Sequence, residues 1–217
     1  SRTVTLTTPV WMMESELTQA QWTAVGLPNP STFSGPDRPV ETVTWWEALE
    51  AANAASRADN LPECYALTGC TNAVGSGREC TGVTVSSASG HPRDCAGWRL
   101  PTKAEWEHAA RAATGLPYAG SDNVDEVAWY NSNSGSQTKA VCTTPTPRNG
   151  WGLCDLSGHM WEWSWDTYTS EYTAAAPTDP VGPTSGPNRA CRGGYWDFNA
   201  RGVRTARRLG FSPAFRG

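Results

Sequence analysis

A short stretch of the sequence, residues 149–166, combines acids, glycines and tryptophans at a spacing that could serve metal chemistry. Asp155 and Gly158 lie on a turn-like segment, and Glu162 follows among tryptophans that occupy every second position. This alternation predicts a strand over 160–165, with the indoles on one face and Glu162 among polar groups on the other. An acid, a glycine and a second acid so spaced could place several oxygens around a cation.

The same stretch supports a plainer interpretation that involves no metal. Glu162 could instead pair with an arginine, such as Arg192 or Arg204, beneath the indoles. A structural hydrogen bond is favoured over catalysis for His159. The sequence contains no Gly-x-Ser-x-Gly elbow and no phosphate loop, and the spacing of its Ser, His and Asp residues suggests no triad. We therefore identify no catalytic residue.

The seven cysteines favour disulfides and an oxidising compartment. Four of them fall within residues 61–97, a segment rich in Gly, Ser and Thr with little apolar pattern: Cys64, Cys70, Cys80 and Cys95. Disulfides are favoured over a zinc site with His91, because zinc sites prefer closely spaced cysteine pairs that are absent here. The sequence does not choose among the possible pairings. Cys142 and Cys154 could pair with each other, which leaves Cys191 as a small buried residue in a strand.

Length and composition bound the class of protein. A chain of 217 residues fits one domain, and its 12 tryptophans supply the buried area that a loop-rich fold needs. The formal net charge of −4 argues against a nucleic-acid partner. No apolar run approaches the roughly 20 residues of a membrane helix. With the cysteines, these features predict an extracytoplasmic protein that is secreted, periplasmic or at the cell surface.

Local patterns predict where the regular elements lie. Three capping boxes of the form Thr-x-x-Gln or Thr-x-x-Glu predict helices over 19–25, 45–56 and 103–113. An alternating, extended run begins the chain at 2–13, and 189–196 is expected to be a core strand with a glycine kink. Turns and short strands are expected over 115–147 and a surface loop over 169–188. No closing strand is expected between the core strand and Gly217. The mixture predicts one α+β domain with the cysteine-rich segment as an insert.

Five motifs, in this order, resemble those of the formylglycine-generating enzyme, or sulfatase-modifying factor, family. They are Glu-Ser-Glu-Leu-Thr-Gln-Ala-Gln-Trp at 14–22, Pro-Val-Glu-Thr-Val-Thr-Trp at 39–45, Trp-Arg-Leu-Pro-Thr-Lys-Ala-Glu-Trp-Glu-His-Ala-Ala-Arg at 98–111, Gly-Leu-Cys-Asp-Leu-Ser-Gly-His-Met-Trp-Glu-Trp at 152–163 and Arg-Gly-Gly-Tyr-Trp at 192–196. The resemblance runs from Val10 to Arg216. It implies a single C-type-lectin-like domain over 1–217, with much irregular structure and the segment at about 61–97 as a subgroup-specific insert.

Catalytic members of this family oxidise a cysteine of a sulfatase to formylglycine, with O₂ and a copper(I) ion held by two cysteines. The resemblance places those two cysteines at Phe198 and Val203 of this chain. Copper(I) needs soft thiolate or thioether ligands, which neither side chain offers. We therefore expect no copper, and whether the chain is an enzyme stays open. Related sulfoxide synthases use a histidine-rich iron site, for which three histidines suggest no arrangement.

The resemblance also implies a structural calcium ion in the stretch considered first. Its side-chain ligands would be Asp155 and Glu162, and its backbone ligands the carbonyl groups of Gly158 and Met160. Calcium prefers several hard oxygen ligands, and a turn that leads into a strand can offer this mixture.

The C-terminal segment is similar to the variable region of retroelement-diversified binding proteins that share this fold. Positions 195, 197, 198, 202, 209–212, 214 and 215 all carry residues that mutation of adenine-rich Asn codons can produce. Rigid aromatics among small polar neighbours are typical of binding surfaces. The predicted ligand-binding residues are Tyr195, Asp197, Phe198, Asn199, Gly202, Leu209, Gly210, Phe211, Ser212, Ala214 and Phe215. A protein ligand is favoured over a glycan.

Three functions remain as hypotheses. The first is a non-catalytic extracytoplasmic binding or display domain, whose C-terminal surface lies on a calcium-braced scaffold. The second is an oxidoreductase or protein-modifying enzyme like the formylglycine-generating enzymes, with a site the sequence does not reveal. The third is a structural surface or assembly protein. Copper, iron or O₂ consumption would favour the second, and a repeating polymer the third.

Overall fold

Three helices begin where the capping boxes predict. The computed structural model describes residues 3–171, 178–183 and 185–217. Its helices are α1 (Gln19–Ala24), α2 (Trp45–Ala58) and α3 (Lys103–Arg111). In each, the N-cap threonine accepts a hydrogen bond from the third helical residue, whose side chain accepts one from the N-cap backbone. Helix α3 ends two residues earlier than predicted, because Ala112 adopts a left-handed conformation with φ of 45°.

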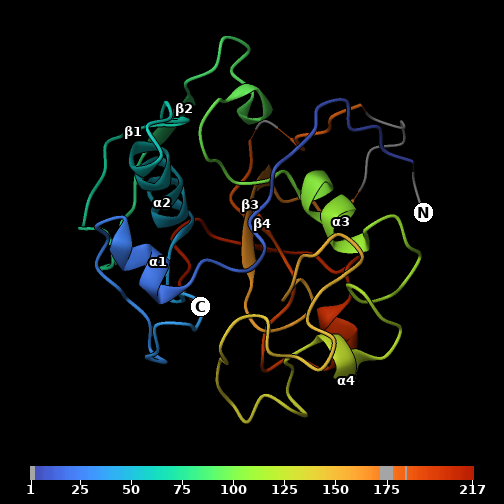
Figure 1. Ribbon diagram of the computed structural model, residues 1–217. Helices are drawn as coiled ribbons and strands as arrows, with labels where there is room; N and C mark the ends of the chain where they lie inside the picture. The colour runs from blue at the N-terminus through green and yellow to red at the C-terminus, as the bar shows by residue number, and fades with distance from the viewer. Residues whose placement is uncertain (1–2, 172–177, 184) are drawn as a thin grey trace.

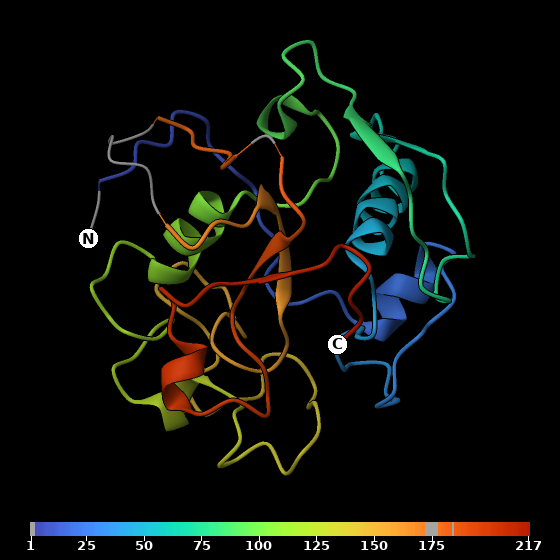
Figure 2. The same cartoon turned by 180° about the vertical axis from the view of Figure 1, so that it is seen from behind.

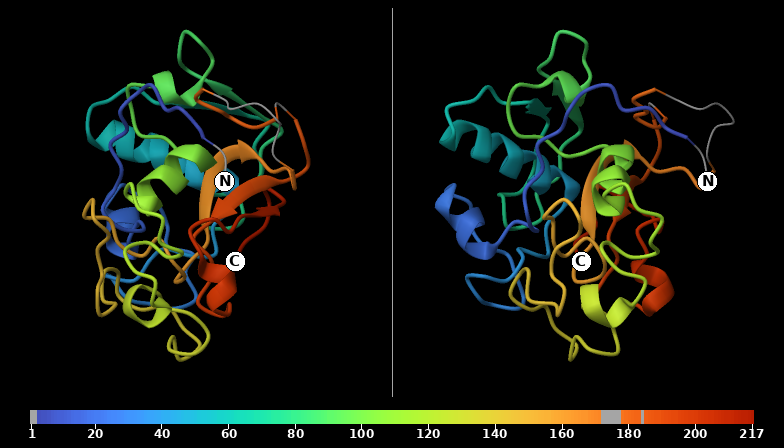
Figure 3. Two further views of the ribbon diagram at one scale, coloured as in Figure 1. Left: turned by 90° about the vertical axis from the view of Figure 1, so that its right-hand side faces the viewer. Right: turned by 45° about the vertical axis from the view of Figure 1, so that its right-hand side comes forward.

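A three-stranded antiparallel sheet lies between the helices (Figure 1, Figure 2). Its order is β3 (Glu162–Thr167), β4 (Arg189–Arg192) and β5 (Leu209–Phe211). Helices α1 and α2 lie to one side of the sheet and α3 to the other, where α3 contacts β3 and β4 (Figure 3). The strand predicted at 160–165 begins and ends two residues later.

Strand β5 corrects the expectation that no closing strand follows the core strand. It pairs antiparallel with β4, and Gly210 lies directly opposite Ala190. A Cβ atom at position 210 would lie 2.4 Å from the ring of Tyr168, so only glycine fits. The sequence concealed this strand because a glycine at its centre removes the alternating pattern that identifies half-buried strands.

The cysteine-rich insert is a disulfide-linked hairpin beside α2. Strands β1 (Tyr65–Thr68) and β2 (Gly82–Val85) pair antiparallel, and a 3₁₀ turn η1 (Pro92–Asp94) follows. The disulfides are Cys64–Cys95, Cys70–Cys80 and Cys142–Cys154, and Cys191 is a buried free thiol in β4. Disulfides rather than zinc are thus confirmed, and the pairing left open by the sequence is resolved.

The alternating tryptophans of β3 pack against the core beside α2. Trp165 stacks on Tyr65 of the insert with ring centroids 5.3 Å apart, and contacts Trp45 of α2. The guanidinium of Arg189 lies 3.9 Å from the ring centroid of Trp45. Trp45 also donates a hydrogen bond of 3.0 Å to the Ser164 carbonyl. The strand is therefore fixed to both α2 and the insert.

Three expectations fail or lie beyond the described structure. Among the described residues of 2–13 there is an isolated bridge between Thr5 and Thr178 but no strand. A short helix α4 (Val124–Val127), capped by Asn123, lies in a region expected to hold turns and strands. The predicted surface loop at 169–188 includes 172–177 and 184, which lie outside the described residues. In the part of the chain that the structure describes, no helix is long and apolar enough to cross a membrane.

Candidate functional site

The predicted ligand-binding residues lie at the surface on two neighbouring segments, 195–202 and 209–215. None of the eleven is fully buried; Asp197, Asn199, Ser212 and Phe215 are exposed and the others half-buried. The first segment contains the 3₁₀ turn η2 (Ala200–Val203), which lies beside α4 in all views (Figure 1, Figure 2, Figure 3). The second contains β5 and the turn after it.

A continuous aromatic row connects the two segments. Ring centroids are 6.3 Å apart between Tyr195 and Phe198, and 5.3 Å between Phe198 and Trp161. From Trp161 the row continues to Phe211 at 5.9 Å, and from there to Phe215 at 4.4 Å. Trp161 was not among the predicted ligand-binding residues, yet it is the member that joins the two predicted segments.

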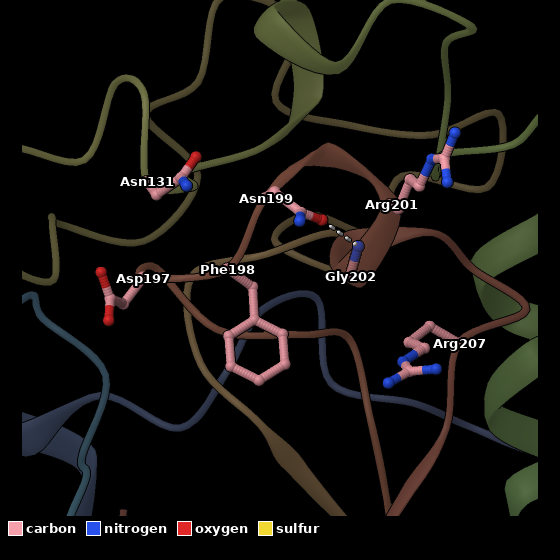
Figure 4. A pocket seen from close by; sticks show the side chains of 7 residues that line it. All are labelled: Asn131, Asp197, Phe198, Asn199, Arg201, Gly202 and Arg207. Carbon is pink, nitrogen blue, oxygen red and sulfur yellow. Dashed lines mark hydrogen bonds between the residues drawn. The ribbon is translucent and has the colours of Figure 1, made fainter.

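An open pocket of about 440 Å³ lies at the Phe198 end of the row. We call it the arginine pocket; it is lined by Asn131, Asp197, Phe198, Asn199, Arg201, Gly202 and Arg207 (Figure 4). The sequence placed four of these seven residues in the ligand surface and missed Asn131, Arg201 and Arg207. A run of arginines with no apolar stripe over 199–208 was the signal for two of them.

A much smaller groove, of about 30 Å³, lies at the Phe215 end of the row. Trp161, Trp163, Phe211 and Phe215 form its aromatic part. Trp163 also contacts Phe211, with centroids 6.4 Å apart. The predicted surface is thus an aromatic row with a polar, charged pocket at one end and an apolar groove at the other.

Hydrogen bonds hold the backbone of the first segment. The side chain of Asn199 accepts a 3.2 Å bond from the Gly202 amide and so caps η2. The amide of Asn131 donates a 3.0 Å bond to the Phe198 carbonyl. Asn199 therefore has a structural role in addition to its place in the pocket.

Arg192 connects this surface to the interior. Its buried guanidinium pairs with Glu107 of α3 and donates hydrogen bonds to the carbonyls of Thr205 and Arg207, at 3.3 and 2.9 Å. The alternative in which Glu162 pairs with Arg192 is therefore wrong, because Glu107 takes that position. Arg204 is exposed and pairs with no acid among the described residues.

The two positions that the resemblance assigned to copper ligands hold apolar side chains. Val203 is completely buried and packs in a cluster with residues of α4, whereas Phe198 contacts Trp161. The free thiol, Cys191, is buried in β4, and burial followed by the charge of Glu162 raises its pKa well above the usual value. A single inert thiol does not make a two-thiolate copper site, so the residues present do not fit copper(I).

The acids of the tryptophan-rich stretch are buried together with a partner from the N-terminal region. Ligand atoms of Glu16, Asp155 and His159 lie within 4.8 Å of one another. Glu162 is not part of that group. Glu16 accepts a 3.0 Å hydrogen bond from the Met160 amide, and its other oxygen lies 2.6 Å from Nδ1 of His159. Sequence reasoning missed Glu16, which lies 144 positions from Met160.

Burial dominates the electrostatics of these acids. It raises the pKa of Glu162 to about 8 and that of Asp155 to about 6, with the charge of Glu16 adding to both. Burial also raises the pKa of Glu16 well above its usual value and lowers that of His159 to about 4. Among the described residues, none of the three carboxyl groups forms an ion pair with a lysine or arginine.

Two oxygens of the predicted calcium ligands lie close to Gly193. The oxygens Asp155 Oδ1 and Glu162 Oε1 are buried and have no hydrogen-bond partner among the described residues. A Cβ atom at position 193 would lie 3.2 Å from the Met160 carbonyl oxygen and 3.5 Å from Glu162 Oε1. Hard oxygens with no counter-charge fit a divalent cation such as calcium. Of the four predicted ligands, the structure thus brings Met160 and Glu162 together at one point.

Comparison with known proteins defines the class of this chain. The sulfatase-modifying factor enzyme 1-like domain family matches residues 2–217, and the chain belongs to that family. The structure has the C-type-lectin-like α+β architecture expected of it. It is similar to Treponema denticola variable protein 1, with a TM-score of 0.77 and 33% identity over 94% of this chain and 79% of that one.

Other relatives include enzymes and proteins of different description. The chain is 37% identical to chaperone protein LppX of Paenibacillus barcinonensis over 180 residues, which are 73% of this chain and 62% of that protein. It is 35% identical to the formylglycine-generating enzyme of Streptomyces coelicolor over 128 residues, 52% of this chain and 40% of the enzyme. The structure of CarF matches with a TM-score of 0.67 and 27% identity, covering 94% and 80% of the two chains. The chain therefore spans under two thirds of either curated relative.

Proposed function

We propose that this protein is a non-catalytic binding or display domain that works outside the cytoplasm. The observation that carries the proposal is the aromatic row, which brings two segments of the predicted ligand surface together without burying them. Rigid aromatics beside small and polar residues give contact area at low cost in conformational entropy. The likeness to a protein described as variable supports the view that this surface differs among related chains.

The scaffold beneath the surface is suited to tolerate such differences. Three disulfides and the buried Arg192–Glu107 pair stabilise the chain without the exposed residues. We include a calcium ion held by Asp155, Glu162 and the carbonyls of Gly158 and Met160, supported by the unpartnered buried oxygens of Asp155 and Glu162. Disulfides are rare in reducing compartments, which supports an extracytoplasmic location.

Two displayed libraries of the full chain test the proposal. One randomises four surface positions, Tyr195, Asp197, Ser212 and Phe215. The matched control library randomises Ala190, Val203 and Thr205, which are buried in the same part of the chain. We expect most members of the surface library to stay folded and to yield binders to a test protein such as lysozyme, and most control members to unfold. Equal loss of folding in both libraries would show that the surface residues are structural.

The enzymatic alternative rests on the likeness to formylglycine-generating enzymes and has its own test. The protein, loaded with copper(I), is incubated with a cysteine-containing sulfatase peptide while O₂ is measured. Because Phe198 and Val203 offer no metal ligand, we expect no O₂ consumption above that of free copper. Conversion of the cysteine to formylglycine would overturn the non-catalytic proposal.

A further inference from the structure

Two arginines of the arginine pocket have no side-chain partner among the residues that the structure describes. Arg201 and Arg207 are both exposed, and no hydrogen bond, ion pair or ring contact involves either guanidinium among the described residues. Figure 4 shows them on one side of the pocket, with Asp197 on the opposite side. The guanidinium of Arg207 extends toward the space between them (Figure 4).

Several other arginines of this chain have partners within the protein, whereas Arg204, like this pair, has none among the described residues. Arg99 pairs with Glu105, and Arg189 lies over Trp45. The chain carries a formal net charge of −4, so acids are available to neutralise cations in general. The lining of the pocket nevertheless includes two arginines without a side-chain partner among the described residues, and Asp197 is its one acid. Exposed charges left unpaired at the edge of an aromatic surface favour a ligand of opposite charge.

We propose that the arginine pocket binds a carboxylate side chain of a protein partner, whose apolar neighbours pack on the aromatic row. This inference rests on the proposed binding function and specifies its ligand. The guanidinium group matches a carboxylate through two parallel hydrogen bonds. Aromatic and apolar contacts next to such an ion pair exclude water and so increase the contribution of the pair to affinity.

A nucleic acid fits the pocket less well than an acidic protein segment. Phosphate backbones are followed by extended tracks of basic residues, and nucleic-acid-binding domains are usually basic overall. Here the lining of one pocket of about 440 Å³ includes two arginines on one side and a single aspartate on the other, on an acidic chain (Figure 4). That size and charge pattern suit one or two acidic side chains.

Selection of a displayed random peptide library on the immobilised full chain tests the proposal. We expect the selected peptides to be enriched in Asp and Glu beside aromatic or aliphatic residues. The double variant Arg201→Gln/Arg207→Gln is expected to weaken their binding about tenfold or more, as for paired charges at interfaces. Arg204→Gln is the matched control, because Arg204 is also exposed and has no side-chain partner among the described residues, but does not line the pocket. It should change affinity less than about twofold.

A second variant separates this inference from the proposed function. Phe215→Ala truncates the far end of the aromatic row and leaves the pocket intact. If peptides lose affinity with Phe215→Ala but not with the double arginine variant, the acidic ligand is wrong and the binding surface stands. If neither variant affects binding, or no peptide is selected, both proposals fail. Equal losses of peptide affinity with Arg204→Gln and with the double variant would show that binding depends only on overall positive charge. The assignment of the carboxylate to the arginine pocket would then be wrong.

Discussion

Glu162 is a buried acid that has no cationic partner among the described residues. It is buried, its Oε1 has no hydrogen-bond partner among the described residues, and the arginine expected to neutralise it is bound to Glu107 instead. An unpaired buried carboxylate is costly, which is why its pKa rises to about 8. The proposed calcium ion removes that cost.

Calcium is therefore expected to stabilise the protein through this residue. At calcium concentrations about 100-fold above the dissociation constant, the gain in unfolding free energy should be about 3 kcal/mol, measured by thermal unfolding with and without EDTA. Glu162→Gln should lose most of this gain, yet be no less stable than the wild type in EDTA. Glu14→Gln, at an exposed position paired with Arg148, should keep it. A wild type that calcium does not stabilise would contradict the proposed ion.

Asp166 gives a prediction about pH that does not involve the metal. Burial raises its pKa to about 6, against the opposing effect of Lys103. Because this pKa is higher in the folded than in the unfolded chain, the residue favours folding below about pH 4 and that contribution is lost as the pH rises through 6. Two pKa units correspond to about 3 kcal/mol.

The matched measurement is denaturant unfolding of the wild type and Asp166→Asn at constant calcium. Between pH 4 and pH 7 the wild type should lose stability relative to the variant, by up to about 3 kcal/mol. A constant difference across this range would mean that Asp166 titrates normally in the folded protein.

At the scale of elements, local sequence signals were sufficient to predict the helices but insufficient to predict all of the sheet and the site. The capping boxes predicted the start of each long helix, because both partners of the box lie within one turn. Strand β5 was missed because Gly210 gives no alternation and is required by Tyr168, a contact between distant segments. Glu16 and Asn131 were missed for the same reason, since distant folding contacts bring them to Met160 and Phe198.

The Arg192–Glu107 pair makes an element-scale prediction, because it ties α3 to the loop at 205–207. Glu107→Gln leaves a buried guanidinium without its anion and is expected to cost about 3 kcal/mol of unfolding free energy. Glu50→Gln removes an acid from a more exposed pair with Arg57 and should cost less than about 1 kcal/mol. Denaturant unfolding of both variants measures the difference, and equal small effects would show that the buried pair does not hold the loop.

At the scale of the whole molecule, this chain differs from the catalytic members of the family in its C-terminal surface. Catalytic relatives are expected to hold copper at the positions of Phe198 and Val203, and here one residue joins an aromatic row while the other fills the core. The sequence predicted the fold and the presence of disulfides, and it left the pairing within the insert open. It could not show that Trp161 joins the two segments, because that contact exists only once β3, β5 and η2 are assembled.

Sequencing of related genes from many isolates tests the binding surface most directly. Variation should concentrate at surface positions such as Tyr195, Asp197, Phe198, Ser212 and Phe215. The buried Val203 and Thr205, in the same segment, should stay constant. Variation spread evenly over 195–215, or a surface as constant as the buried positions, would contradict the account.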